Sequence, residues 1–365
     1  MSKKIRVAIL FGGKSAEHEV SLRSAESVAN AIDKSKYEVV LIGIDKTGRW
    51  LMGNSGVQLL NTSNPKLYKL NSFNTSSVTL VPQGGGNLSV PGQSEGSQNS
   101  IDVVFPILHG PFGEDGTVQG LLKLANIPFV GASVLGSAVG MDKDIMKRLL
   151  RQAGIPIGKF ITIRSGQEIS FAKAKKDLGL PLFIKPANMG SSVGVSKVEN
   201  KEQFETALAE AFRFDNKIIF EEFIDGREIE CSVLGNDSPI ASLPGEIIVK
   251  KGFYDYETKY IDESAAHIEI PAKLPKKIIK DIQTLAIKTF KVLSCEGLGR
   301  VDCFLTKKGK VIINEINTMP GFTNMSVYPK LWEASGICYS ELIDRLIELA
   351  LERFEKEKKL EVSYV

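Results

Sequence analysis

Hydrophobic runs alternate with amphipathic segments from the start of the chain. One run covers residues 5–11 and ends at Gly12-Gly13, an amphipathic stretch follows over 21–32, and a second run covers 37–44. Continuous apolar runs are typical of strands buried on both faces, and a 3.6-residue period is typical of a helix. This order predicts a parallel sheet with helices on its faces. The same unit continues with an expected strand at 103–108 and an expected helix at 117–125.

The chain divides at two places into what we expect to be three domains. Small residues at 131–140 and the pair Asp225-Gly226 are typical of boundaries. We expect an N-terminal parallel α/β (Rossmann-like) domain at 1–135, a central domain at 136–225 and a C-terminal domain at 226–365. A polar excursion at about 61–100, with one short strand near 78–81, interrupts the first. The later domains should hold helices at 143–153, 201–213, 275–293 and from 339, strands at 182–185, 217–223 and 228–234, and a hairpin at 300–317.

Composition narrows the class of protein. The 365 residues are 43% hydrophobic and 24% charged, as in globular proteins, which excludes wholesale disorder. The net charge of +3 is too small to suggest a nucleic-acid partner. No apolar run approaches the length of a membrane helix, and no secretory signal is apparent, so we expect no membrane partner. The four cysteines are widely spaced, which favours reduced thiols and a cytoplasmic location.

The hairpin at 300–317 is the first candidate for chemistry. With Lys308-Gly309 at its tip, Asp302 faces Glu315, and Asn317 and Arg300 share their face. Opposed carboxylates repel unless a cation lies between them, and an oxygen donor set without His or Cys suits Mg²⁺ or Mn²⁺. A solvated acidic edge is the alternative. The other face should be a core surface made of Val301, Cys303, Leu305, Ile312 and Ile316.

A second candidate follows the expected strand at 182–185. Lys185 ends that strand, and the loop Gly190-Ser-Ser-Val-Gly194 comes next. Backbone N–H groups, two hydroxyls and one ammonium are suited to a phosphate chain, although a plain flexible turn is the alternative. An oxygen-ligand metal site downstream favours phosphate, because Mg²⁺ is commonly held by carboxylates together with substrate phosphates.

Other segments leave their roles open. Lys143 is the first residue of the helix expected at 143–153, and on its own it is expected to be a solvated surface residue. The run 220–224, followed by Glu228, fits either an exposed strand or a wall between domains that could hold a nucleoside. The Gly-rich turn at 12–19 lacks the third glycine of a dinucleotide site, and its carboxylate could instead hold a substrate ammonium.

Seven ordered segments together resemble the D-alanine:D-alanine ligases of the ATP-grasp superfamily, nearly from end to end. They are Gly12-Gly-Lys-Ser-Ala-Glu-His-Glu-Val-Ser21, His109-Gly-Pro-Phe-Gly-Glu-Asp-Gly116, Met141-Asp-Lys143, Lys185-Pro with 190–194, Tyr254-Asp-Tyr-Glu-Thr-Lys-Tyr260, Arg300-Val-Asp302 and Asn314-Glu-Ile-Asn-Thr-Met-Pro-Gly321. The stretch at 61–100 resembles the longer members, and Val327 stands where the family often has Leu.

The resemblance implies a three-domain ATP-grasp fold in which the last two domains sandwich ATP. It also implies a reaction. ATP phosphorylates one D-alanine, and the amine of a second attacks the acyl phosphate, giving a tetrahedral intermediate and then D-alanyl-D-alanine for peptidoglycan precursor synthesis. Ligases that make D-alanyl-D-lactate or D-alanyl-D-serine, another ATP-grasp ligase and a non-catalytic nucleotide-binding module are the alternatives. Family members also imply a homodimer.

The resemblance assigns roles residue by residue. A pair of Mg²⁺ or Mn²⁺ ions would be held by Asp302, Glu315 and Asn317. The catalytic set would be Glu17, Ser191, Tyr260, Arg300 and Gly321. ATP would be bound by Lys143, Lys185, Ser191, Ser192, Val193, Gly194, Glu221, Glu222, Phe223, Ile224, Glu228 and Lys259. Substrate would be met by Glu17, His109, Lys259, Tyr260, Arg300, Ser326 and Val327. Tyr260 occupies the acceptor-specificity position, and its loop resembles a lid.

Overall fold

The computed structural model describes residues 3–53, 75–90, 100–249, 266–361 and 363. Its first sheet, called the N-terminal sheet, has the order β4-β3-β2-β1-β7. The strand β1 runs parallel to both β2 and β7, as predicted, because the fully buried run Val7–Phe11 needs covered faces on both sides. Antiparallel strands β3 and β4 complete one edge. The bounds are β1 Ile5–Gly12, β2 Tyr37–Ile44, β3 Trp50–Gly53, β4 Thr75–Ser77 and β7 Val103–Ile107.

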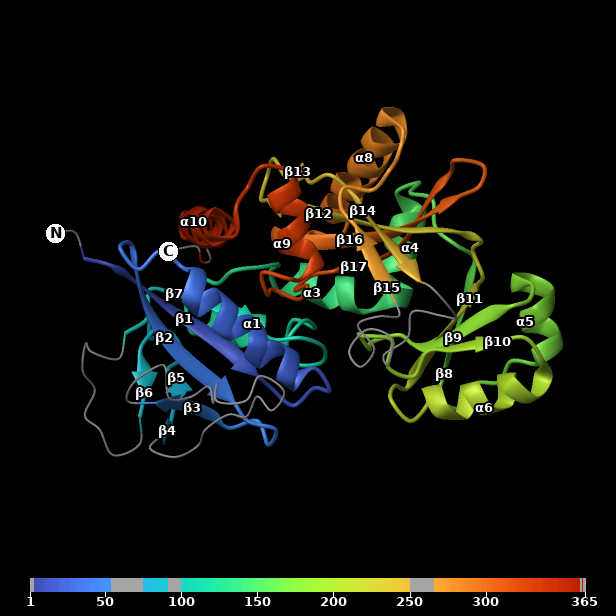
Figure 1. Cartoon of the computed structure of the whole chain (residues 1–365). Helices are drawn as coiled ribbons and strands as arrows, with labels where there is room; N and C mark the ends of the chain where they lie inside the picture. The colour runs from blue at the N-terminus through green and yellow to red at the C-terminus, as the bar shows by residue number, and fades with distance from the viewer. Residues whose placement is uncertain (1–2, 54–74, 91–99, 250–265, 362, 364–365) are drawn as a thin grey trace.

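Helices from both ends of the chain cover this sheet. The helix α1 (His18–Ala31) begins three residues before the predicted start, and α2 (Thr117–Leu124) ends one residue early. The last helix, α10 (Tyr339–Glu357), packs against α1 and β7 (Figure 1). Its buried residues Leu342, Ile343 and Leu346 share one hydrophobic core with β1 and β7. The C-terminal helix therefore completes the core of the N-terminal sheet.

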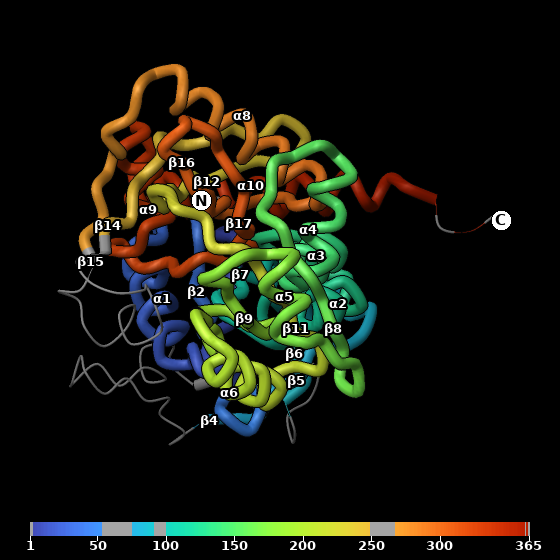
Figure 2. Tube along the Cα trace, turned by 90° about the vertical axis from the view of Figure 1, so that its right-hand side faces the viewer, coloured from blue at the N-terminus to red at the C-terminus, as the bar shows by residue number. Residues whose placement is uncertain are grey.

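The central sheet is antiparallel throughout, with the order β10-β9-β11-β8. One face packs on α5 and α6 through an aromatic cluster in which Phe204 lies 5.6 Å from Phe171 and 5.6 Å from Phe220, between ring centroids. Seen from the side of α5 and α6, this sheet lies in front of the N-terminal sheet (Figure 2). The bounds are β8 Phe160–Arg164, α5 Phe171–Leu178, β9 Leu182–Pro186, β10 Ser196–Val198, α6 Lys201–Ala211 and β11 Lys217–Glu222.

The C-terminal sheet has the order β15-β14-β12-β16-β17, with β13 paired to β12. Helix α8 packs on one face, and its Ile282, Ala286 and Phe290 enter a core shared with β12, β16 and β17. The bounds are β12 Gly226–Gly235, β13 Ile240–Ala241, β14 Gly245–Val249, β15 Ala266–Glu269, α8 Lys276–Val292, β16 Gly297–Thr306, β17 Val311–Asn317 and α9 Val327–Ala334.

The predicted hairpin register is confirmed at its open end and wrong toward its tip. Asp302 pairs with Glu315 and Arg300 with Asn317, as expected. A bulge between Asp302 and Cys303 then shifts the register, so that Cys303 pairs with Ile313. The core face therefore takes Ile313 (1% exposed) in place of the predicted Ile312, which is only partly buried. An inserted residue re-aims every later side chain of a strand because the side-chain period is two.

Two regions differ from the predicted outline. The small-residue stretch at 131–140 contains helix α3 (Val134–Met141), which leads into α4 (Lys143–Gln152). Helix α3 can approach its neighbours closely because a Cβ at Gly136 would lie 2.5 Å from the Ser294 carbonyl oxygen. The polar excursion holds β5 (Thr79–Leu80) paired with β6 (Leu88–Ser89), while 61–74 and 91–99 fall outside the described residues. Within the described ranges, no helix has the length and apolarity needed to cross a bilayer.

A buried arginine ties α10 to the end of the N-terminal sheet. Arg353 is 6% exposed as a residue. Its guanidinium lies over the Phe129 ring and donates to the carbonyl oxygens of Phe129 (2.8 Å) and Gly131 (2.5 Å). We expect Arg353→Met to lower the free energy of unfolding by about 3 kcal/mol, because two buried carbonyl groups lose a donor. Urea unfolding followed by circular dichroism measures this.

A matched control lies on the same helix. Arg345 pairs with Glu341 one turn away, and both side chains are about two-fifths exposed, at 42% and 43%. Arg345→Met should change the free energy of unfolding by less than about 0.5 kcal/mol, since exposed ion pairs contribute little. Equal urea midpoints of unfolding for Arg353→Met and Arg345→Met would contradict the role of Arg353 as a buried hydrogen-bond donor that stabilises the fold.

Candidate active site

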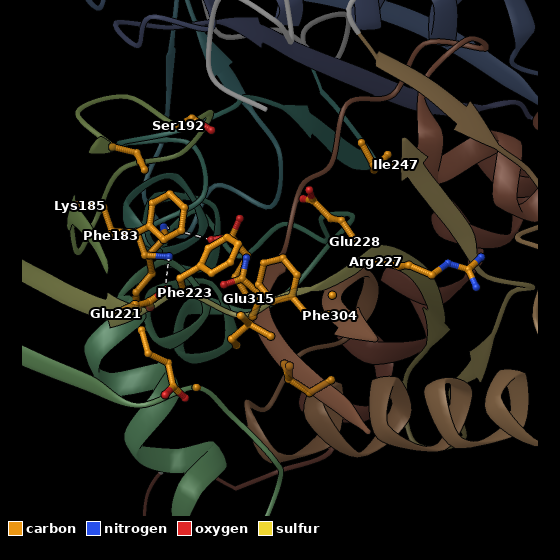
Figure 3. A pocket seen from close by; sticks show the side chains of 18 of the residues that line it. Phe183, Lys185, Ser192, Glu221, Phe223, Arg227, Glu228, Ile247, Phe304 and Glu315 are labelled. Carbon is orange, nitrogen blue, oxygen red and sulfur yellow. Dashed lines mark ion pairs between the residues drawn. The ribbon is translucent and has the colours of Figure 1, made fainter. Parts of the chain in front are cut away.

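A cavity of about 410 Å³ lies between the central and C-terminal sheets. Figure 3 shows Lys185 and Glu221 on one side of it and Glu228 and Ile247 on the other. Phe183, Phe223, Phe304 and Ile247 supply flat and branched apolar surface, and ammonium and carboxylate groups supply charge. This combination suits a ligand with an aromatic ring and an anionic chain. The predicted residues that line the cavity are Lys143, Lys185, Ser191, Ser192, Glu221, Glu222, Phe223, Ile224, Glu228 and Glu315.

The cavity wall contains a chain of buried charges that centres on Glu221. Its carboxylate lies 2.7 Å from the Lys185 ammonium and 3.1 Å from that of Lys147. Burial alone would raise the pKa of Glu221, but the two ammonium groups together lower it. Lys147 is 2% exposed, and its ammonium also donates to the Asn314 carbonyl oxygen at 3.1 Å. Lys147 was not predicted as a site residue, although its spacing of four from Lys143 places both on one helix face.

The loop after β9 has the backbone of an anion-binding turn. Ser191, Ser192 and Gly194 have φ of +50°, +59° and +69°, in the left-handed region. A turn in which left-handed residues stand next to residues with ordinary φ, such as Val193, can direct successive backbone N–H groups toward one side and form a concave site for an anion. The Lys143 ammonium donates to the Met189 carbonyl oxygen at 2.7 Å, just before this loop. Val193 and Gly194 complete the turn but are not among the residues that line the cavity.

A hydrogen bond joins this loop to the N-terminal sheet. The Ser191 hydroxyl donates to the Glu17 carboxylate, which directly precedes helix α1. A Cβ at Gly110 would lie 3.1 Å from the same carboxylate, and one at Gly190 would lie 3.3 Å from it. Two glycines thus leave room around Glu17. The carboxylate lies where the phosphate-type loop, α1 and the loop after β7 meet.

Two further titratable groups lie beside Glu17, in the loop after β7. Burial and the Glu17 charge raise the pKa of Glu114 to about 8. Burial lowers the pKa of His109, whose Nδ1 lies 2.9 Å from the Met319 carbonyl oxygen. Nδ1 must donate in that bond, so Nε2 is the acceptor of the neutral ring, and within the described structure it has no partner. His109 was predicted as a site residue from the sequence, and Glu114 was not.

The open end of the hairpin supplies the oxygen ligands expected for a metal. Arg300 donates twice to Asp302, at 2.7 Å for both bonds, and lies 3.2 Å from Glu230. Glu315 lies 3.5 Å from the Lys143 ammonium at the cavity. The donors are carboxylate and amide oxygens, which fit Mg²⁺ or Mn²⁺. No cluster of three or more His, Cys, Asp or Glu side chains able to hold a metal occurs in the described part of the chain.

The segment after β17 brings the last predicted residues together. A Cβ at Gly321 would lie 3.2 Å from the Ser326 hydroxyl, which accepts from the Thr323 N–H at 3.0 Å. Val327 begins helix α9. Asp302 on β16 and Asn317 at the end of β17 are not among the residues that line the cavity. The predicted lid covers 249–260. Its first residue, Val249, ends strand β14, and residues 250–260, including Lys259 and Tyr260, fall outside the described residues.

Comparison with known proteins gives the same family over the whole chain. The D-ala D-ala ligase N-terminus matches residues 6–132 and the D-ala D-ala ligase C-terminus matches residues 149–348. A D-alanine–D-alanine ligase of Oceanobacillus iheyensis is 55% identical over 362 residues, covering 99% of both chains.

Solved structures agree with this match. The D-alanine-D-alanine ligase from Coxiella burnetii has a TM-score of 0.87 at 39% identity, covering 98% of this chain and 97% of its own. The VanG D-Ala:D-Ser ligase from Enterococcus faecalis has a TM-score of 0.84 at 38% identity, covering 95% of this chain and 100% of its own. The resemblance seen in the motifs is therefore confirmed along with the ATP-grasp fold, and the chain belongs to the D-alanine–D-alanine ligase family.

Proposed function

We propose that this chain joins two molecules of D-alanine into D-alanyl-D-alanine with conversion of ATP to ADP and phosphate, a step of peptidoglycan precursor synthesis. One observation carries the proposal. The Ser191–Glu17 hydrogen bond places a phosphate-type loop directly beside a carboxylate suited to an amino-acid ammonium. An ATP γ-phosphate held by that loop and an amino acid held by that carboxylate would be neighbours. The 55% identity to a D-alanine–D-alanine ligase supports the choice of substrate.

The cavity provides each part of ATP with a chemically matched surface. We assign the adenine to the region of Glu221, Glu222, Phe223 and Ile224, and the ribose hydroxyl groups to Glu228. Lys143 and Lys185 would neutralise the phosphates, and loop 190–194 would donate backbone N–H groups to them. Lys259 would add a further cation to this set.

We assign the metal to Asp302, Glu315 and Asn317, with two Mg²⁺ or Mn²⁺ ions as the expected complement. When bound, the ions would neutralise the charge that develops on the transferring phosphoryl group. Lys143 at 3.5 Å from Glu315 then links the metal-binding hairpin to the phosphate loop. Arg300 donates two hydrogen bonds to Asp302, which orient that carboxylate.

The reaction would proceed in two steps at this junction. A carboxylate oxygen of the first D-alanine, whose ammonium is held by Glu17 beside His109, attacks the γ-phosphorus, and ADP leaves. The amine of the second D-alanine then attacks the acyl carbon, and the tetrahedral intermediate expels phosphate. Arg300 and the Gly321 N–H would donate to the oxyanion of that intermediate. Lys259, Tyr260, Ser326 and Val327 would meet the second D-alanine, with Tyr260 and Ser191 orienting its amine.

The remaining proposals concern location and assembly. We retain a cytoplasmic site of action and the division into domains at about residues 135 and 225. A homodimer is supported by large hydrophobic side chains that are exposed on the neighbouring helices α2, α3 and α4, namely Leu121, Leu124, Leu135, Ile145 and Leu149. Large exposed apolar patches often mark protein–protein interfaces, so exposed hydrophobic side chains on adjacent helices support a contact between two copies of the chain.

The first experiment mixes purified protein with ATP, Mg²⁺ and D-alanine, measures ADP and identifies the product by mass. We expect D-alanyl-D-alanine, and a larger kcat/KM for D-alanine than for D-serine or D-lactate as acceptor. Glu315→Gln should lower turnover by about 100-fold or more, because a metal-binding carboxylate is lost. The exposed Glu333→Gln is the control. Preferential use of D-serine as acceptor would contradict the proposed substrate and indicate the acceptor specificity named for the VanG D-Ala:D-Ser ligase.

Substrate binding should release a proton at pH 7. Burial and the Glu17 charge hold the pKa of Glu114 at about 8, so the free enzyme mostly carries that proton. An ammonium at Glu17 offsets its charge and lowers the pKa of Glu114, so D-alanine should bind more tightly as pH rises from about 6.5 to 8. Calorimetry at pH 7 in buffers of different ionisation enthalpy measures the released proton. Buffer-independent heats would contradict this prediction.

The dimer is tested by light scattering after size-exclusion chromatography. Leu135 is 59% exposed on α3. We expect Leu135→Asp to shift the wild-type dimer toward the monomer, because it places a charge in the apolar contact. Leu360 is also strongly exposed, at 69%, but lies beyond α10, so Leu360→Asp should leave the mass unchanged. A wild-type monomer at micromolar concentration would overturn the dimer proposal.

A further inference from the structure

Both backbone polar groups of Met319 are held by one loop of the N-terminal part of the chain. One Glu114 side-chain oxygen accepts from the Met319 N–H at 3.1 Å, which also donates to Asn317 Oδ1 at 3.2 Å, and the other oxygen accepts from the Gly110 N–H at 2.6 Å. His109 donates to the Met319 carbonyl oxygen at 2.9 Å. More than 200 residues separate Glu114 from Met319 along the chain. Glu114 thus connects the loop after β7 to the segment after β17.

The three groups lie in a closed environment. His109, Glu114 and Met319 are 4%, 7% and 2% exposed. Water therefore does not compete for these hydrogen bonds, and each bond resists displacement more strongly than a surface one. The Met319 side chain also packs close to Gly131, where a Cβ would lie 3.0 Å from its Cε.

The same segment is held further along by the N-terminal elements. The Phe322 N–H donates to Ser24 at 3.3 Å, and the Asn324 N–H donates to Ser27 at 3.1 Å, both on helix α1. The Phe322 ring packs edge-on against Phe105 of β7, with 5.5 Å between centroids. The segment 319–324 is therefore built onto the N-terminal sheet, although it belongs to the C-terminal half of the chain.

Gly321 follows Met319 by two residues, with Pro320 between them. The proline ring restricts φ, so the direction of the chain at Met319 is carried to Gly321 with little freedom. The loop after β7 contacts Met319 and also lies beside Glu17. The contact between this loop and Met319 therefore sets the distance between the Gly321 N–H and the Glu17 carboxylate. An oxyanion donor is effective only when its position is set before the reaction.

We propose that Glu114 is a positioning residue that aligns the oxyanion donor at Gly321 with the ammonium site at Glu17, without itself touching substrate. The proposal rests on the proposed function, since the oxyanion role of Gly321 belongs to it. Glu114 is suited to the task because its two oxygens serve two separate strand ends. One oxygen holds its own loop and the other holds the segment that precedes Gly321.

The neighbouring residue offers a matched control. Asp115 accepts from the N–H groups of Phe112 (2.9 Å) and Thr117 (3.0 Å) and so stabilises the same loop. Both of its contacts are local, and they do not include the segment after β17. Asp115→Asn therefore loosens the loop alone, whereas Glu114→Gln replaces one of two acceptor oxygens by an amide and weakens the connection between the two segments.

The experiment compares wild type, Glu114→Gln and Asp115→Asn in steady-state kinetics and in inhibition by a phosphinate analogue of the dipeptide, whose tetrahedral phosphorus imitates the intermediate. For Glu114→Gln we expect kcat to fall by about 100-fold, inhibition by the phosphinate to weaken similarly, and KM for ATP to stay within about threefold. Asp115→Asn should keep all three quantities near the wild-type values. An unchanged kcat in Glu114→Gln, or an equal loss in both variants, would overturn the proposal.

Amide hydrogen exchange separates this proposal from the proposed function. We expect the Met319 and Gly321 amides to exchange at least tenfold faster in Glu114→Gln than in wild type, without substrate, and to be unchanged in Asp115→Asn. If these amides exchange faster in Glu114→Gln but the wild-type protein makes no dipeptide, the proposed function is wrong and the alignment by Glu114 is supported. Unchanged exchange in Glu114→Gln would refute the alignment whatever the activity.

Discussion

The pairing of buried charges is the constraint on which the site depends. A charged group removed from water is costly unless it has an opposite charge or hydrogen-bond donors within reach. Glu221 meets two ammonium groups, and Asp302 meets the Arg300 guanidinium. Most of these partners come from different elements. The need to pair each charge therefore fixes how α4, β11, β16 and β17 meet, and it leaves a cavity lined with oriented charges.

The site lies where three sheets meet, and this arrangement explains its chemistry. The central and C-terminal sheets enclose the cavity, while the N-terminal sheet brings Glu17 to it through Ser191. A ligand with an anionic chain and a second ligand with an ammonium can then lie side by side. Helix α10 stabilises this arrangement although it lies outside the site. It buries its apolar face on the N-terminal sheet and contacts α1 and β7.

Long regular elements were predictable because their local pattern and their final burial agree. The strand at 37–44 and the carboxylate pair Asp302–Glu315 match the structure. The bulge that exchanges Ile312 for Ile313 was not predictable, since both residues are equally apolar and only the pairing partner decides which faces the core. Helix α3 was also missed, because the small residues at 131–140 are typical of a linker. The structure shows that a small residue is needed where Gly136 of the helix packs close to Ser294.

The sequence by itself determined the family, several of the longer helices and strands, and most of the residues gathered at the site, because each motif keeps its residue types at a local spacing. Only the tertiary structure revealed Lys147, Glu114 and Arg353. Each is a charged residue that a single sequence presents as an ordinary surface group, and each becomes significant through burial against a segment far away in the chain. Burial and long-range pairing arise from the packing of whole elements, and a local pattern carries no information about them.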